Sequence, residues 1–254
     1  MGFKRFLEEN KYYIFPENAD AVNKLEAFIL NEEDSGQQIP IIVGASGNGK
    51  TALTMAAMKW MSVKKDKTAF FVEAIIFSEF IVNFIMEKRK KEHEQDPNKE
   101  EYEEKIYTTF SKGYDYLIIE NLDLLMEKGM HSTLLEIFRI VGILNRKGCK
   151  VIITSIAGID YVPFMEYCKF CNLKRMVISS MTRETKKNLI TKLSVNNMRI
   201  TEMGKRYIAQ NATTINDIKS ILTEVEARKN GGMAASEAIQ KAINERAKTI
   251  IIHG

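Results

Sequence analysis

A glycine-rich run between an apolar segment and a helical pattern constrains the fold of this chain more than any other feature. The run is Gly44-Ala-Ser-Gly-Asn-Gly-Lys50-Thr51, and it satisfies the pattern G-x-x-x-x-G-K-[ST] in full. The apolar residues 39–43 precede it, and helical spacing of apolar residues begins at Leu53. A strand, a glycine-rich turn and a helix in this order predict a loop whose backbone N–H groups point inward at an anion.

Each residue type in this loop suits the phosphates of a nucleotide. The glycines allow the backbone to turn, Lys50 is expected to neutralise the β- and γ-phosphates, and the Thr51 hydroxyl is expected to ligate Mg²⁺. The sequence therefore predicts binding of a nucleoside di- or triphosphate together with Mg²⁺. The residues expected to contact the nucleotide are Gly44, Ala45, Ser46, Gly47, Asn48, Gly49, Lys50, Thr51 and Ala52.

An apolar segment that ends in an acidic residue is the second element that a phosphate site needs. Residues 116–119 are followed by Glu120 and Asn121. Glu120 can hold the metal, so Thr51 and Glu120 are the predicted Mg²⁺ ligands. Asn121 can orient water by hydrogen bonding, but its amide cannot act as a general base. Asp123 lies two residues beyond Asn121, and the sequence does not predict that it reaches the site.

Apolar segments of strand length alternate with helical patterns in the first part of the chain. This alternation predicts an α/β fold of the P-loop NTPase class, with a central parallel five-stranded sheet and crossover helices. Because the strand segments are almost unbroken in apolar character, we expect them to be buried on both faces. The predicted strands are residues 39–43, 69–72, 116–119, 151–154 and 176–178, and apolar stripes of helical spacing run through 53–61 and 134–141.

Strand patterns stop near residue 180, and helical patterns follow. The predicted helices are residues 182–194, 201–211, 214–229 and 233–248. We therefore predict an α/β nucleotide-binding domain over residues 1–180 and a small all-helical lid domain over residues 181–254. Residues 87–105 differ from both because most of their side chains are charged. A solvated helix end and loop is the expectation for this segment, with a partner contact as the alternative.

The composition is that of a folded chain without a membrane span. Hydrophobic residues make up 45% of the sequence, and no apolar run approaches the roughly 18 residues that cross a bilayer. We expect a cytoplasmic protein with no membrane partner. The net charge of +4 is too small to identify a polyanionic partner. Cys168 and Cys171 have a C-x-x-C spacing, but no second pair completes a zinc site, so packing is their expected role.

With these elements placed, the chain resembles the AAA+ module of the bacterial replication initiator DnaA and of its shorter relative Hda, over nearly its whole length. Besides the glycine loop, five ordered segments carry the resemblance. They are the helix at 77–84, the acidic strand end at 118–125, the sensor 1 strand at 151–155, the spacing from Cys168-Lys169-Phe170 to Glu184-Thr185-Lys186, and the sensor 2 helix at 214–222.

The resemblance implies that the nucleotide is ATP or ADP. It also implies catalytic positions around the γ-phosphate, and several of them depart from the family pattern. The implied positions are Lys50, Glu120, Asn121, Ser155, Lys169 and Asn216. Glu120-Asn121 replaces a pair of aspartates, Ile156 follows Ser155 where an aspartate is usual, Lys169 replaces the arginine finger, and the sensor 2 position is the uncharged Asn216. Each change affects a group that acts on developing charge, so the resemblance implies slow or absent hydrolysis.

Simpler roles stay open for two of these positions. Lys169 can be a solvated lysine, and Asn216 can be a helix-start residue beside a capping pattern formed by Thr214 and Asp217. The sequence is therefore consistent both with an ATPase and with a chain that binds ATP without hydrolysing it.

Three functions follow from the motifs. The first is an ATP-binding, DnaA-like AAA+ protein that assembles with itself or with another AAA+ protein in replication initiation or its regulation. The second is a helicase loader or transposition helper of the DnaC and IstB kind, with single-stranded DNA or a replicative helicase as partner. The third is an interaction module that nucleotide stabilises without a catalytic cycle. Basic clusters such as 64–67 and 174–175 suit the second function, although a solvated surface is their expected role.

Overall fold

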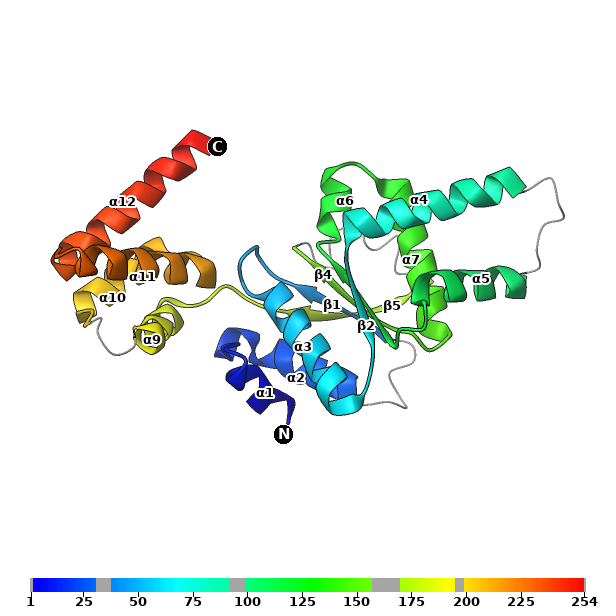
Figure 1. The fold of residues 1–254 in the computed structure, drawn as a ribbon, viewed down its shortest axis with the longest axis horizontal. Helices are drawn as coiled ribbons and strands as arrows, with labels where there is room; N and C mark the ends of the chain where they lie inside the picture. Colours follow the sequence, from blue (N-terminus) through cyan, green and yellow to red (C-terminus); the bar gives the residue numbers. More distant parts are fainter. Residues whose placement is uncertain (1, 31–37, 92–98, 157–169, 195–198, 254) are drawn as a thin grey trace. The chain divides into compact units, whose positions relative to one another are not determined.

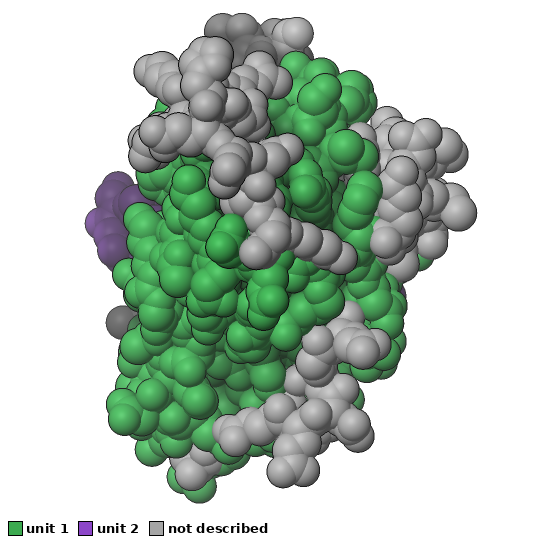
Figure 2. Space-filling model, turned by 90° about the vertical axis from the view of Figure 1, so that its right-hand side faces the viewer, with its two compact units in different colours: residues 1–45, 50–178 green, residues 46–49, 179–254 purple. Residues whose placement is uncertain are grey.

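The chain divides into two compact units, which Figure 2 distinguishes by colour. The computed structural model describes residues 2–30, 38–91, 99–156, 170–194 and 199–253. Unit 1 comprises residues 1–45 and 50–178, and unit 2 comprises residues 46–49 and 179–254. The boundary that the sequence places after residue 180 lies close to the boundary after residue 178. Among the described residues, no helix has the length and apolar composition to cross a membrane.

Unit 1 is built on one parallel sheet. Its strands are β1 (Gln38–Val43), β2 (Ala69–Glu73), β3 (Tyr116–Glu120), β4 (Lys150–Ser155) and β5 (Asn172–Val177). They lie in the order β2-β3-β4-β1-β5, and every neighbouring pair is parallel. This confirms the predicted α/β class with a five-stranded parallel sheet. Because the strands are parallel, their carboxyl ends all lie at the same edge of the sheet, and the order makes β1, β4 and β3 neighbours there. Open α/β sheets bind their ligands at this edge.

Helices cover both faces of this sheet (Figure 1). The first face carries α1 (Phe3–Glu9), α2 (Pro16–Leu30) and α3 (Lys50–Lys65), and the second carries α4 (Ala74–Lys91), α5 (Lys99–Ser111), α6 (Asp123–Glu127) and α7 (His131–Arg146). Alternate strand residues serve the two faces, because successive side chains of a strand point in opposite directions. Ile118 packs in the cluster with α1–α3, and its neighbour Ile119 packs in the cluster with α4–α7; both are fully buried.

The predicted burial of the strands on both faces is wrong for the edge strand β2, whose residues 69–71 are only partly buried. The other edge strand, β5, begins at Asn172 and so earlier than predicted, and its additional residues Lys174 and Arg175 are exposed. An edge strand has a neighbour on one side only, and charged side chains there discourage pairing with another chain. The central strands β3 and β4 are buried as predicted, apart from the half-exposed Lys150.

The charged segment 87–105 is more helical than expected. Helix α4 continues to Lys91, and α5 begins at Lys99, on either side of residues outside the described part. The two helices are joined through aromatic packing, because the ring of Phe110 on α5 lies 5.6 Å from that of Phe77 and 5.3 Å from that of Phe84. These rings lie on the parts of α4 and α5 that flank the charged segment, and their burial stabilises both helices, since aromatic side chains bury large areas.

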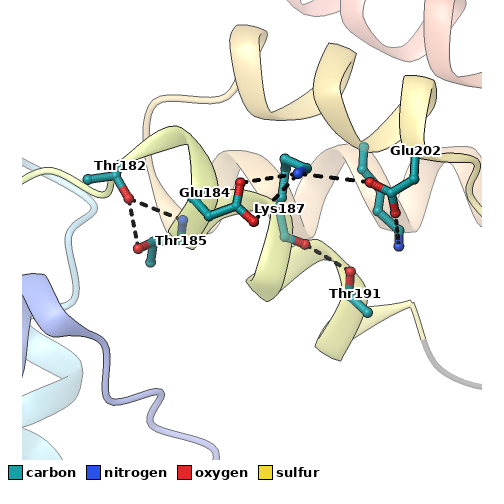
Figure 3. A network of polar contacts seen from close by, with 7 residues as sticks. Thr182, Glu184, Thr185, Lys187, Thr191 and Glu202 are labelled. Atoms are coloured by element: carbon teal, nitrogen blue, oxygen red, sulfur yellow. Dashed lines mark hydrogen bonds and ion pairs between the residues drawn. The ribbon is translucent and has the colours of Figure 1, made fainter.

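From residue 179 onward, the described part of unit 2 contains helices and no strand, as predicted. Its helices are α9 (Arg183–Leu193), α10 (Glu202–Asn211), α11 (Ile215–Asn230) and α12 (Ala235–His253). A threonine precedes each of the first three and accepts a hydrogen bond from a backbone N–H of the first turn. At α9 the capping residue is Thr182 (Figure 3). Lys187 of α9 lies between Glu184 of its own helix and Glu202 of α10.

Candidate functional site

The glycine-rich loop has a backbone that only glycine adopts without strain. Gly47 and Gly49 have φ angles of 78° and 91°, in the left-handed region. At Gly44 the reason is space, because a Cβ atom there would lie 2.5 Å from the carbonyl oxygen of Ile178. The glycines of the motif are therefore explained by the shape of the loop itself. Residues 46–49 of this loop are grouped with unit 2.

Lys50 begins α3, and its ammonium lies against the loop. Its Nζ donates to the carbonyl oxygen of Gly44 at 2.7 Å and to that of Ala45 at 3.2 Å, and the residue is buried. Burial lowers the pKa of Lys50 below its ordinary value of 10.5, and the carboxylates of Asp123 and Glu120 oppose that shift. A cation held by two neutral carbonyls and two nearby acids can exchange the carbonyls for phosphate oxygens, which hold it more strongly.

Glu120, at the end of β3, is held by two hydroxyls of α3. Thr51 Oγ1 donates to Glu120 Oε2 at 2.6 Å, and Thr54 Oγ1 donates to Glu120 Oε1 at 2.7 Å. The carboxylate is almost completely buried, with 1% of Glu120 exposed. The structure thus brings together the two residues that the sequence predicts as Mg²⁺ ligands. A carboxylate and a hydroxyl are hard oxygen donors, so this pair fits Mg²⁺.

Two residues near this carboxylate were missed by the motif argument. Thr54 lies one helical turn after Thr51, and their three-residue spacing is the signal that places both hydroxyls on one face of α3. Asp123 is buried, and its Oδ1 accepts a hydrogen bond from the backbone N–H of Ile156 at 2.7 Å. Its charge favours the protonated form of Lys50 and so opposes the lowering of the Lys50 pKa by burial.

Asn121 occupies an unusual backbone position just after β3. Its φ angle is 56°, in the left-handed region that asparagine tolerates better than most residues. Its backbone N–H donates to Thr154 Oγ1 on the neighbouring strand at 3.0 Å. Ser155 ends that strand with a fully buried side chain, and among the described residues its Oγ has no hydrogen-bond partner. The predicted residues Glu120, Asn121 and Ser155 therefore lie at the carboxyl ends of adjacent strands.

The remaining predicted positions are Asn216, Lys169 and Cys168. Asn216 is an exposed residue in the first turn of α11. The Thr214–Asp217 capping box beside it is confirmed, since the Thr214 side chain accepts from Asp217 N, and Asp217 accepts from Thr214 N at 2.9 Å. A role of Asn216 toward nucleotide stays a prediction. Lys169 and Cys168 lie outside the described residues, so the finger position and the C-x-x-C pair are not placed.

A metal site other than the Thr51–Glu120 pair finds no support in the described ranges. No group of three or more histidine, cysteine, aspartate or glutamate side chains is clustered there. Cys149 is buried, and burial raises the pKa of its thiol to about 12, so it is an unreactive core residue.

Comparison with solved structures identifies the fold. No protein-family profile matches the sequence, and no curated protein matches it. Domain III of the replication initiation protein DnaA from Thermotoga maritima is 16% identical with a TM-score of 0.61, over 89% of this chain and 91% of that chain. AMPPCP-bound DnaA from Aquifex aeolicus is 18% identical with a TM-score of 0.64, over 91% of this chain and 68% of that chain.

The same fold extends beyond bacterial initiators. ORC1 from Aeropyrum pernix, solved in complex with DNA, is 15% identical with a TM-score of 0.61, over 91% of this chain and 66% of that chain. At such identities the likeness concerns the fold. The chain has the fold of a DnaA-like AAA+ module.

Proposed function

We propose that this chain is an ATP-binding protein of the DnaA-like AAA+ kind, which acts in replication initiation or its regulation through nucleotide-dependent assembly. The observation that carries the proposal is the pairing of Thr51 with the buried carboxylate of Glu120, beside a glycine loop that ends in Lys50. The fold supports the same proposal, because the AMPPCP-bound Aquifex aeolicus DnaA has it.

The chain's own residues account for binding of a triphosphate with a metal. Backbone N–H groups of the glycine loop face the phosphates, and Lys50 exchanges its contacts with Gly44 and Ala45 for phosphate oxygens. Thr51 and Glu120 hold Mg²⁺ through their oxygens. When bound, Mg²⁺ neutralises the charge of the phosphates.

Hydrolysis is proposed to be slow or absent. Asn121 follows the metal-holding residue where a carboxylate polarises water in related folds, and an amide cannot accept the proton of that water. Asn216 carries no charge with which to stabilise a transferring phosphoryl group. Nucleotide then regulates the chain by binding rather than by being hydrolysed, since contacts made only in the bound state shift the population of conformations.

The proposed partners are a second copy of this chain or another AAA+ protein of the DnaA kind. The Aeropyrum pernix ORC1 structure contains DNA, and that observation describes ORC1 rather than this chain. For this chain, single-stranded DNA belongs to a second candidate function, the helicase loader or transposition helper. The exposed position of Lys64, Lys174 and Arg175 favours that candidate. Binding of single-stranded DNA that weakens steeply with salt would support it over the first.

The test is calorimetric titration of the full chain with ATP and Mg²⁺. We expect saturable binding in the wild type and at least a tenfold loss of affinity in Lys50→Ala, because charge-assisted hydrogen bonds to phosphate are lost. Lys59→Ala is the matched control, because Lys59 lies on the same helix with its Nζ on Asn10. Absence of binding by the wild type, or equal binding by both variants, would contradict the proposal.

A further inference from the structure

Helix α3 presents two hydroxyls to one carboxylate. Thr51 Oγ1 lies 2.6 Å from Glu120 Oε2, and Thr54 Oγ1 lies 2.7 Å from Glu120 Oε1, so each oxygen of the carboxylate has its own donor. The two donors differ in surroundings, because Thr51 is exposed at the start of the helix and Thr54 is fully buried. The carboxylate is thus approached from an open side and from a closed side.

The hydroxyl of Thr54 has a choice of acceptors, and the carboxylate is the strongest of them. Its Oγ1 also lies 3.0 Å from the carbonyl oxygen of Thr51 and 3.4 Å from that of Lys50. A hydroxyl has a single proton to donate. The contact with Glu120 is the shortest and is assisted by charge, so the proton lies on that contact. The helix carbonyls already serve the backbone ladder, whereas no other hydrogen bond is given to Glu120 Oε1 among the described residues.

We propose that Thr54 is a positioning residue for the metal site: it holds Glu120 Oε1 so that Oε2 stays beside Thr51. The inference rests on the proposed function, in which Thr51 and Glu120 hold Mg²⁺. It explains how a glutamate serves at this strand end. Glutamate has one more rotatable bond than aspartate, and fixing that bond costs conformational entropy. The hydrogen bond from Thr54 restricts the longer side chain before the metal arrives.

Metal binding affects the two hydrogen bonds differently. For Thr51 Oγ1 and Glu120 Oε2 both to face a cation, the Thr51 proton must turn away from the carboxylate, and that hydrogen bond is lost. The bond from Thr54 to Oε1 needs no such change and persists. Thr54 therefore contributes to the metal-dependent part of nucleotide affinity, and it leaves the metal-independent part, which comes from the loop and Lys50, unaltered.

The experiment measures the affinity of the full chain for ATP twice, with Mg²⁺ and with EDTA. Thr54→Val removes the hydroxyl and keeps the shape, and we expect the ratio of the two affinities to fall about tenfold, as for other groups that orient a metal ligand. Thr54→Ser restores the hydroxyl, so the ratio should return to within about twofold of the wild type. Ser62→Ala, also a hydroxyl on α3, is the control with no expected change.

A second comparison separates positioning from a merely structural role. In Glu120→Asp the carboxylate withdraws from Thr54 by one methylene, so adding Thr54→Val should change the ratio much less than it does in the wild type. A Thr54→Val protein that unfolds at a lower temperature but keeps the wild-type ratio would overturn the inference and leave the proposed function standing. A wild type that binds no ATP with or without Mg²⁺ would overturn the proposed function itself.

Discussion

At the scale of single residues, the charge balance around Lys50 decides how the loop can bind an anion. The ammonium is buried, and its hydrogen bonds go to two uncharged carbonyls of the loop. Asp123 and Glu120 both support its charged form, Asp123 more strongly than Glu120. Asp123 is itself fixed by the backbone N–H of Ile156. Asp123 therefore connects the chain just after β4, through this hydrogen bond, with Lys50, through its charge.

The variant Asp123→Asn tests that link. An asparagine can still accept the hydrogen bond from Ile156 N, but its side chain has no charge. The pKa of Lys50, already below 10.5 because of burial, then falls further. Since the protonated form binds phosphate, ATP affinity should start to decline at a lower pH in the variant than in the wild type. Titrations between about pH 7 and pH 10 measure this, with Asp20→Asn as control on the exposed part of α2. Identical pH profiles would rule out the coupling.

The candidate site could be predicted from the sequence only where a motif fixes the backbone. The glycine pattern predicts the loop, Lys50 and Thr51, because the pattern encodes a single strand–turn–helix geometry. Thr54 belongs to no motif, and Asp123 lies two residues beyond the Glu120-Asn121 pair that the motif argument uses. Their reach depends on side-chain length and on how α3 and α6 pack against the ends of the strands, which spacing along the chain does not contain.

At the scale of elements, periodicity predicts those helices and strands whose apolar residues all serve one core. The strands β1, β3 and β4 and the stripe of α7 are of this kind. Helices α1 and α2 were not predicted, although Phe3 and Leu25 are buried against the first face of the sheet. Their helical signal is short or interrupted by polar residues, and tertiary packing rather than local pattern stabilises them.

The capping box of α11 makes unit 2 sensitive to acid. Burial raises the pKa of Asp217, but hydrogen bonds from Thr213 and Thr214 outweigh it, and the net pKa lies below the ordinary 3.8. Arg246 of α12 faces the same carboxylate. A lowered folded pKa gives stability that is complete above the unfolded pKa and is lost as pH falls through the folded one.

The corresponding variant is Asp217→Asn, and the measurement is urea unfolding followed by helical circular dichroism. Near neutral pH the variant should be less stable than the wild type by about 1 kcal/mol, as for the loss of a helix cap. Below pH 3.8 the difference should shrink, because the wild-type carboxylate becomes protonated. A difference that is constant from neutral pH to about pH 2 would show that the charge of Asp217 contributes nothing.

At the scale of the whole molecule, the residues proposed to hold the metal and the terminal phosphates belong to unit 1. Lys50, Thr51 and Glu120 are in it, and so are the positioning residue Thr54 and the charge of Asp123. A ligand that binds only the folded form stabilises it by mass action, by about 2.7 kcal/mol at a concentration 100 times the dissociation constant. Nucleotide should therefore suppress the unfolding of unit 1.

Cys149 provides a probe of that unfolding at a residue that is not among the predicted ligands. Only 1% of the residue is exposed, and burial, with a smaller effect of Asp115, raises the pKa of its thiol to about 12. Alkylation needs an exposed thiolate, so the rate of labelling reports how often unit 1 opens. With ATP and Mg²⁺ at 100 times the dissociation constant, labelling of the Cys149 peptide, followed by mass spectrometry, should slow about 100-fold. Lys50→Ala should lose this protection. Equal rates with and without nucleotide in the wild type would mean that the folded unit does not bind it.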